Sequence, residues 1–406
     1  MSRRLPLTLA CWDYDRTEPL RDGRVRPEGV DLTYLSLPVE ETFFRMARFH
    51  EFDAAEMSLS SYVLTLFRDA PFIAIPVFPS RAFRHNGIYV NTAAGIEKPA
   101  DLAGRIVGIP EYQVTAAVWI RGILAERHDL PVDAVRYRTG GIHSPGRIEK
   151  VRLNLPPGIE VEPIPADRTL ADMLVSGEID ALYSPRTPRP FTDGRPEVRR
   201  LFQDSRAAEE QYFGETGIFP IMHVIALRRE LYEARPWLAR SLYDAFEAAR
   251  LQTAGRLGET AATRYMLPWL YDEVERTRGL MGQDFWSYGL GPNESTLRTF
   301  LRYSHEQGLA ERLLDPADLF AAETLESYVI CSRSTHAARR PAGGHAGAAP
   351  GGMGHPGPAC HRGARHRRPA RPGIRHERGA RHGDGRARGL AAPAAALPGR
   401  ARGRGR

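Results

Sequence analysis

The sequence predicts an α/β fold, and three observations lead to that prediction. Short apolar runs with strand character alternate with amphipathic helical stretches through the first 330 of the 406 residues. Apolar residues make up 42% of the chain and charged residues 26%, which excludes a collagen, a fully disordered chain and a disulfide mini-protein. No run of 18 apolar residues occurs, so no membrane-spanning helix is expected. Strands separated by helices favour parallel sheets.

The expected elements follow one another along the first 330 residues. Strands are expected where β-branched and apolar residues form short runs bounded by Gly or Pro, at 7–11, 30–37, 72–78, 87–91, 105–109, 180–183 and 219–227. Helices are expected where apolar residues recur at helical spacing, at 40–50, 58–67, 115–127, 170–176, 236–255 and 296–307, with a helical turn at 99–103. The hydroxyl-rich start of the helix at 58–67 suits a helix N-terminus.

The last 76 residues differ sharply in composition from the rest. Between 331 and 406, Gly, Ala, Arg and Pro account for 58 residues, and no Phe, Tyr or Trp occurs. Such a segment cannot bury enough apolar surface to fold, so we predict a disordered tail. Two explanations stay open: a frame-shift product of GC-rich coding DNA, or a basic tail that binds nucleic acid. The tail carries a net charge of +15 and residues 1–330 carry −8, so no nucleic-acid partner is expected for the folded body.

The sequence gives no sign of a cofactor, metal or export signal. Cys11, Cys331 and Cys360 form neither a disulfide framework nor a metal-binding spacing, and no Walker loop, CxxC or HExxH motif occurs. Asp13 and Asp15 interrupt the first apolar stretch, so no signal-peptide core is present. We therefore expect a cytoplasmic protein that needs neither cofactor nor metal and does not bind a membrane. A homo-oligomer is left open.

Polar side chains directly after the expected strands are the candidate site residues. Ligands of open α/β sheets bind outside the carboxyl ends of the strands. The candidates are Trp12, Asp13, Tyr14, Glu56, Ser58, Arg81, Arg84, Gln113, Thr115, Arg186 and His223. Structural roles compete with functional ones at each of them. Glu56 suits a helix cap, His223 a buried core histidine, and the pair Arg81 and Arg84 a surface salt bridge.

Nine ordered segments of the chain resemble the 4,5-dihydroxyphthalate decarboxylase family. They lie at 26–38, 53–63, 74–90, 98–116, 146–151, 176–188, 216–231, 282–293 and 305–309. The resemblance implies a two-lobed type II periplasmic-binding-protein-like fold with a ligand cleft between the lobes. It places lobe one at 1–97 and 217–330 and lobe two at 98–216, with the tail at 331–406 outside the fold.

The resemblance also implies cofactor-independent conversion of 4,5-dihydroxyphthalate, a small aromatic carboxylate, to protocatechuate and carbon dioxide. Under that reading His223 is the leading acid or base, because an imidazole suits proton transfer near neutrality. Glu56 and Asp13 are the competing carboxylate candidates for a catalytic role. The other roles are retained-carboxylate binding by Arg81, Arg84 and Arg186, oxygen binding by Ser58, Gln113 and Thr115, and ring stacking by Trp12 or Tyr14. A solute-binding protein of an importer, or another lyase on the same fold, remains an alternative.

Overall fold

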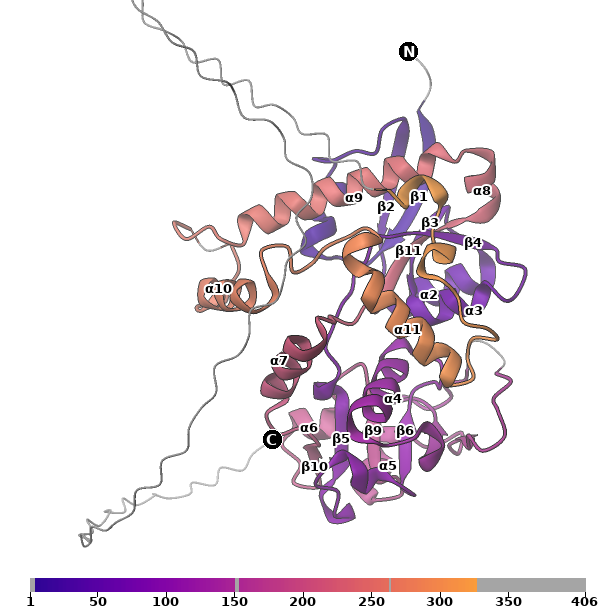
Figure 1. The fold of residues 1–406 in the computed structure, drawn as a ribbon, viewed down its shortest axis with the longest axis vertical. Helices are drawn as coiled ribbons and strands as arrows, with labels where there is room; N and C mark the ends of the chain where they lie inside the picture. Colours follow the sequence, from indigo (N-terminus) through magenta and orange to yellow (C-terminus); the bar gives the residue numbers. More distant parts are fainter. Residues whose placement is uncertain (1–3, 150–152, 263, 327–406) are drawn as a thin grey trace, which may run out of the picture. The chain divides into compact units, whose positions relative to one another are not determined.

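The computed structural model describes residues 4–149, 153–262 and 264–326. The tail predicted at 331–406 lies outside the described residues. Most elements lie within a few residues of their predicted positions, and the strands form two sheets (Figure 1). We call the part built on the N-terminal sheet the first lobe and the part built on the other sheet the second lobe.

The first lobe is built on five strands in the order β2-β1-β3-β11-β4. Their bounds are β1 Leu5–Cys11, β2 Val30–Ser36, β3 Ala54–Ser58, β4 Phe72–Ile75 and β11 His223–Arg228. β1 is parallel to β2 and β3, whereas β11 runs antiparallel to both β3 and β4. The predicted parallel sheet is therefore mixed. β11 enters this sheet only after the chain has passed through the second lobe, so no local β-α-β crossover fixes its direction.

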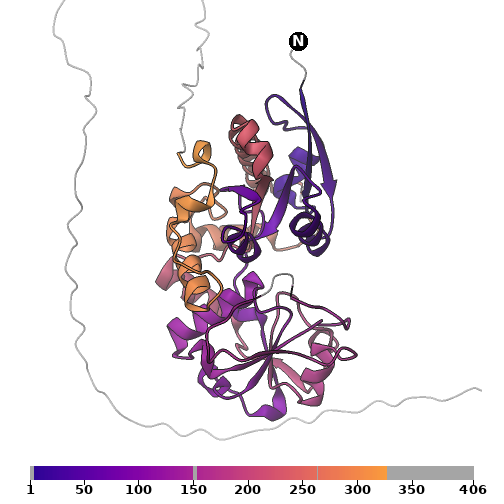
Figure 2. The ribbon, with the colours of Figure 1, turned by 90° about the vertical axis from the view of Figure 1, so that its right-hand side faces the viewer.

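The second lobe is built on six strands in the order β10-β5-β9-β6-β7-β8. Their bounds are β5 Ile88–Asn91, β6 Ile106–Ile109, β7 Arg136–Thr139, β8 Val161–Pro163, β9 Ala181–Tyr183 and β10 Val198–Arg200. Figure 2 shows these strands at the centre of the lobe, with helices and loops around them. β5 pairs with β9 and β10, so the chain first crosses between lobes before Ile88, earlier than the 97/98 boundary we expected. β7, β8 and β10 escaped prediction because they are short and rich in charged residues.

Eleven α-helices pack on and between the sheets in the described residues. Their bounds are α1 Glu18–Arg21, α2 Val39–Phe49, α3 Leu59–Thr65, α4 Thr115–His128, α5 Leu170–Ser176, α6 Arg189–Thr192, α7 Ser205–Thr216, α8 Arg229–Ala234, α9 Trp237–Arg256, α10 Leu270–Met281 and α11 Glu294–Glu306. No helix among residues 4–149, 153–262 and 264–326 is long and apolar enough to cross a membrane.

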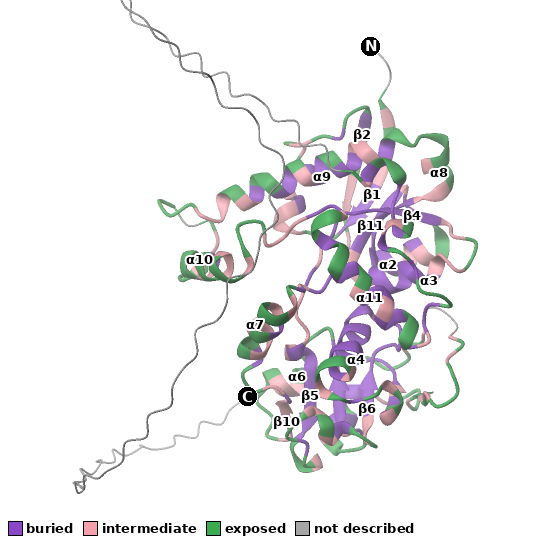
Figure 3. Cartoon of the chain, viewed as in Figure 1, coloured by how far each residue is buried: buried purple, intermediate pink, exposed green. Residues whose placement is uncertain are grey.

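The helix α4 joins the two lobes. It is buried along most of its length, as the purple ribbon in Figure 3 shows, and it packs against α3 of the first lobe and against α11. The indole N–H of Trp119 donates to the carbonyl of Ile221 at 2.9 Å. The buried Arg121 donates to the side chain of Gln307 at 2.8 Å. The C-terminal segment that we expected in lobe one therefore also contacts the second lobe.

A glycine in α4 lets α11 approach closely, and we expect Gly122→Ala to lower the melting temperature. A β-carbon at position 122 would overlap the ring of Tyr303. Overpacking of this kind costs about 1–3 kcal/mol, more than the roughly 1 kcal/mol of helix propensity gained. The matched control is Gly279→Ala in α10, where a β-carbon meets no atom within 4 Å and should raise the melting temperature. A Gly122→Ala variant as stable as the parent would contradict this packing.

Candidate active site

Eight of the eleven predicted residues line one pocket of 470 Å³. They are Trp12, Tyr14, Ser58, Arg84, Gln113, Thr115, Arg186 and His223. Trp12, Tyr14, Ser58 and His223 come from the strand ends of the first sheet. Gln113 and Thr115 come from the start of α4, and Arg186 follows β9. The pocket therefore combines side chains of both lobes.

The strand register of the first sheet explains how Glu56 meets His223. His223 lies directly across from Ser58, and Ile225 lies across from Glu56. Alternate residues of a strand share a face, so Glu56, Ser58 and His223 all lie on the same face of the sheet. Glu56 and His223 are then diagonal neighbours, within reach of side chains of this length. The ring Nδ1 of His223 lies 2.6 Å from Oε1 of Glu56.

Glu56 is a fully buried carboxylate with several hydrogen-bond donors. Besides His223, it accepts the hydroxyl of Tyr14 at 2.7 Å and the backbone N–H of Trp12 at 3.0 Å. Burial alone would raise the pKa of Glu56, but the charge of His223 and these hydrogen bonds hold that pKa below its usual value. Glu56 is thus an anion that orients the imidazole.

The environment of His223 leaves one ring nitrogen for the pocket. With Nδ1 donating to Glu56, Nε2 is the nitrogen that can exchange a proton with a ligand. No residue among those described hydrogen-bonds Nε2. The ring of Phe43 meets the imidazole edge-on, with centroids 4.8 Å apart. His223 lines the pocket with a side chain that is 17% exposed, so it is not the closed-off core histidine we also considered.

The hydroxyl of Tyr14 donates to Glu56, and one face of its ring is already covered, so Tyr14 is less suited than Trp12 to stack on a ligand ring. Burial and the nearby Glu56 carboxylate raise the pKa of Tyr14, so its hydroxyl stays protonated and donates. The guanidinium of Arg16 covers one face of the Tyr14 ring at 4.2 Å from its centroid. Trp12 lines the same pocket and is 41% exposed, so its ring is more open to a ligand than that of Tyr14.

Hydroxyl groups of the two lobes meet at the floor of the pocket. The Ser58 and Thr115 hydroxyl oxygens lie 2.8 Å apart, and the Thr115 hydroxyl accepts the backbone N–H of Ser60 at 3.0 Å. All three side chains are buried. This contact ties the end of β3 to the start of α4.

The arginines that line the pocket differ in how their charge is balanced. Arg186 donates to both carboxylate oxygens of Glu40, at 3.1 and 2.6 Å. Arg84 instead donates to the sulfur of Met222 at 3.1 Å, and no carboxylate in the described part of the chain forms an ion pair with it. Burial lowers the pKa of Arg84 to about 10, which leaves it a cation at neutral pH. Arg84 is the pocket cation whose charge a ligand carboxylate would balance.

The structure does not bring Arg81 and Asp13 to this pocket. Arg81 is buried and donates to the carbonyls of Phe219 and Ser287 at 3.3 and 2.9 Å, so it braces two loops. Asp13 points to the surface, where it pairs with Arg21 at 2.8 Å. Glu56, the competing carboxylate, is the one that meets His223.

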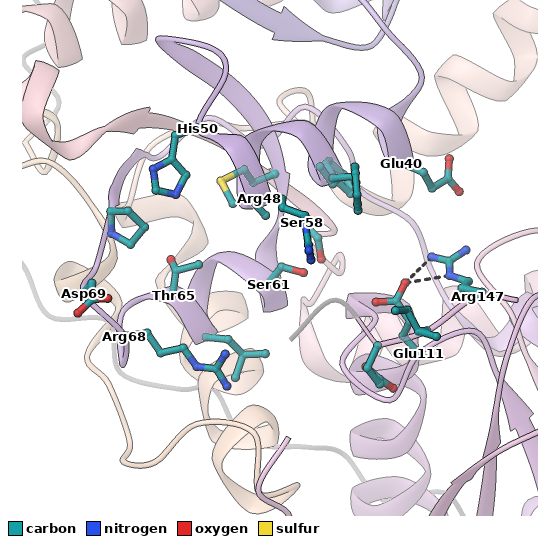
Figure 4. Close-up of a pocket in the computed structure, with 18 residues that line it drawn as sticks. Glu40, Arg48, His50, Ser58, Ser61, Thr65, Arg68, Asp69, Glu111 and Arg147 are labelled. Atoms are coloured by element: carbon teal, nitrogen blue, oxygen red, sulfur yellow. Dashed lines mark hydrogen bonds and ion pairs between the residues drawn. The ribbon is translucent and has the colours of Figure 1, made fainter. Parts of the chain in front are cut away.

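Two functional candidates were missed from the sequence, Glu111 and Arg147. Both line the 470 Å³ pocket and an adjoining cavity of 720 Å³. Figure 4 shows them facing each other at one side of that cavity, with Ser58 and Ser61 nearby. Glu111 lies in the polar cluster after β6 that contains Gln113, but no spacing links it to an arginine 36 residues away. No group of His, Cys, Asp and Glu among the described residues could hold a metal ion.

Comparison with known proteins gives close sequence relatives. No family model matches the sequence. A protein of Comamonas testosteroni named 4,5-dihydroxyphthalate decarboxylase is 44% identical over 328 residues, covering 80% of this chain and 99% of its own length. A protein of Pseudomonas putida with the same name is 46% identical over 211 residues, covering 52% of this chain and 82% of its own.

Similar solved structures are far more distant in sequence. The periplasmic aliphatic sulphonate binding protein SsuA of Escherichia coli is 11% identical, with a TM-score of 0.46 over 79% of this chain and 99% of its own. The desulfurization enzyme DSZB is 17% identical, with a TM-score of 0.44 over 79% of this chain and 98% of its own.

Proposed function

The chain belongs to the 4,5-dihydroxyphthalate decarboxylase family, and from that premise we propose that it converts 4,5-dihydroxyphthalate to protocatechuate and carbon dioxide. The observation that carries this proposal is the His223–Glu56 pair at a pocket whose cation Arg84 forms no ion pair with a carboxylate among the described residues. The His223–Glu56 pair supplies a positioned proton donor. Arg84 supplies a binding site for the carboxylate that the product keeps.

The substrate itself provides the electrons for the reaction. The leaving carboxylate is para to one hydroxyl, so loss of the phenolic proton pushes electron density onto the carbon that bears that carboxylate. A proton delivered to this carbon interrupts aromaticity, and breaking the bond to carbon dioxide restores it. The net reaction consumes one proton. The enzyme therefore needs an acid at the ring carbon and a group that accepts the phenolic proton.

His223 is placed to be that acid. The Glu56 carboxylate at 2.6 Å orients the imidazole and fixes which ring nitrogen faces the pocket. Glu56 acts through His223 and is a positioning residue. Trp12 is proposed to stack on the substrate ring, because its side chain lines the pocket and is half-exposed.

The leaving carboxylate should lie against an apolar part of the pocket. Strong ion pairs to it would stabilise the substrate more than the transition state and slow the reaction. Phe43 and Val114 are apolar side chains that line the pocket and suit this role. The retained carboxylate is assigned to Arg84, with Ser58 and Thr115 as neighbouring hydroxyl groups.

Incubation of the purified, metal-stripped protein with 4,5-dihydroxyphthalate tests the proposal. We expect protocatechuate and carbon dioxide in equal amounts, at a rate that added divalent metal does not change, because the phenol supplies the electrons. Tight binding without turnover would support a solute-binding protein instead. Turnover of other aromatic acids but not of this one would support a different lyase.

We expect Arg84→Met to raise KM about 10- to 100-fold, the loss that follows removal of a charge-assisted hydrogen bond. The effect should fall on KM more than on kcat if the retained carboxylate is held equally in the ground and transition states. The control is Arg195→Met at the surface, where the substitution removes an exposed ion pair with Glu197. An unchanged KM for Arg84→Met would show that Arg84 does not bind the retained carboxylate.

We further propose that the enzyme is cytoplasmic and that its binding partner is a small aromatic carboxylate. Whether it forms a homo-oligomer is to be measured. Cys11 is a free, buried thiol 3.6 Å from Glu56, and a reducing compartment preserves such a thiol. Cell fractionation and sedimentation of the purified protein test the two points.

A further inference from the structure

The second lobe contributes a buried acid that the reaction scheme above does not use. Glu111 follows β6, is 1% exposed, and lines the pocket that holds His223. Two guanidinium nitrogens of Arg147 donate to Oε1 of Glu111, at 2.8 and 2.7 Å, as the dashed lines in Figure 4 mark. The Glu111 carboxylate, paired with the Arg147 guanidinium, therefore lines a pocket that is proposed to bind a substrate with two carboxylates of its own.

Gln113 adds a second acceptor to the same wall. It is 1% exposed, and its amide nitrogen lies 3.5 Å from Oε2 of Glu111. This orientation of the Gln113 amide is the favourable one, because a flipped amide would direct its oxygen at the Glu111 carboxylate. The amide oxygen of Gln113 is buried and has no hydrogen-bond partner in the described part of the chain. A buried acceptor of this kind calls for a donor.

We propose that Glu111 and Gln113 accept the two adjacent hydroxyl groups of the substrate ring, and that Glu111 takes the phenolic proton. This inference rests on the proposed function and extends it. The ligand has carboxylates on one edge and hydroxyl donors on the other. The pocket offers the cation Arg84 for the first and acceptors for the second. The charge of Glu111 also repels a carboxylate, which disfavours the reversed orientation.

The proton transfers of this arrangement balance. The phenolic O–H bond breaks, the proton joins the Glu111 carboxylate, and the electron pair stays on the phenolate oxygen. That charge moves into the ring as His223 protonates the carbon bearing the leaving carboxylate. Carbon dioxide departs with cleavage of the C–C bond, and Glu111 returns its proton to the phenolate. Arg147 stabilises the charge that passes between the two oxygens. The one proton consumed enters through His223.

Binding of two simple ligands tests the inference without relying on turnover. Protocatechuate has the retained carboxylate and both hydroxyls, whereas benzoate has the carboxylate alone. The wild-type protein should bind protocatechuate about 10- to 100-fold more tightly than benzoate, and Glu111→Gln should remove most of that ratio. Benzoate affinity should persist in Glu111→Gln, which shows that the pocket is folded. In turnover, Glu111→Gln should lower kcat, and Arg147→Lys should retain more activity than Arg147→Met.

Controls and opposing outcomes follow from the same titrations. Glu162→Gln removes an exposed acid of the second lobe that pairs with Arg138, and it should leave both affinities unchanged. The inference is overturned if the wild type does not distinguish the two ligands, or if Glu111→Gln leaves their ratio intact. A wild-type protein that shows the ratio but never decarboxylates would count against the proposed function and leave the hydroxyl recognition standing.

Discussion

His223→Gln should lower kcat by about 10²- to 10⁴-fold, the usual loss when a general acid is removed. The glutamine side chain is similar in size and polarity, but it cannot deliver a proton to a carbon atom. Substrate affinity should change little, because Arg84 and the hydroxyl groups of the pocket remain. Steady-state kinetics and equilibrium binding of protocatechuate, measured on the same preparation, separate the two effects.

The competing structural role of His223 makes a different prediction. A histidine that only supports the core would give a variant with a lower melting temperature and normal turnover per folded molecule. His305→Gln is a matched control, since Nδ1 of His305 also has a hydrogen-bond partner, the carbonyl of Ala310 at 3.0 Å, and His305 lies in α11 and does not line the pocket. A folded His223→Gln enzyme with the parent's kcat would return this histidine to a structural role.

Local patterns in the sequence were enough to place most elements but not to arrange them. The helix predicted at 170–176 matches α5 residue for residue, and the predicted helix at 236–255 is displaced from α9 by one residue. Each is set by the spacing of its own apolar residues. The direction of β11 depends on contacts with β3 and β4, which lie far earlier in the chain and on the other side of the second lobe in sequence. No local pattern encodes that.

The candidate site shows the same limit at the level of single residues. Arg81 and Arg84 are three residues apart and equally polar, yet one donates to backbone carbonyls and the other lines the pocket. Both arginines were predicted to be site residues because they follow a strand. The path of the loop determines which of them reaches the pocket. Glu111 and Arg147 show the converse case. Their pairing depends on how the loop after β7 folds back toward β6, and no local pattern in the sequence shows that.

Glu56→Gln should impair both catalysis and stability, because Glu56 is a buried anion toward which His223, Tyr14 and Trp12 direct donors. A glutamine oxygen in the place of Oε1 can accept from both His223 and Tyr14, but the amide group would then face the backbone N–H of Trp12. In Ser-His-Asp triads, replacing the orienting carboxylate with its amide costs about 10⁴-fold in kcat, and we expect a loss of at least tenfold here. Unsatisfied buried donors should lower the free energy of unfolding by about 1–3 kcal/mol at neutral pH.

The difference in the free energy of unfolding between the parent protein and Glu56→Gln should depend on pH. That dependence tests whether Glu56 is ionised in the folded protein. The pKa of Glu56 in the folded protein is below its usual value of 4.5. Its contribution to stability is therefore complete above that value and lost as the pH falls through the lower folded pKa. Glutamine does not titrate, so urea unfolding should show the gap between the two proteins closing below about pH 4.5. A gap that stays constant into acid would mean that Glu56 is not the anion beside His223, and the acid role proposed for His223 would lose its support.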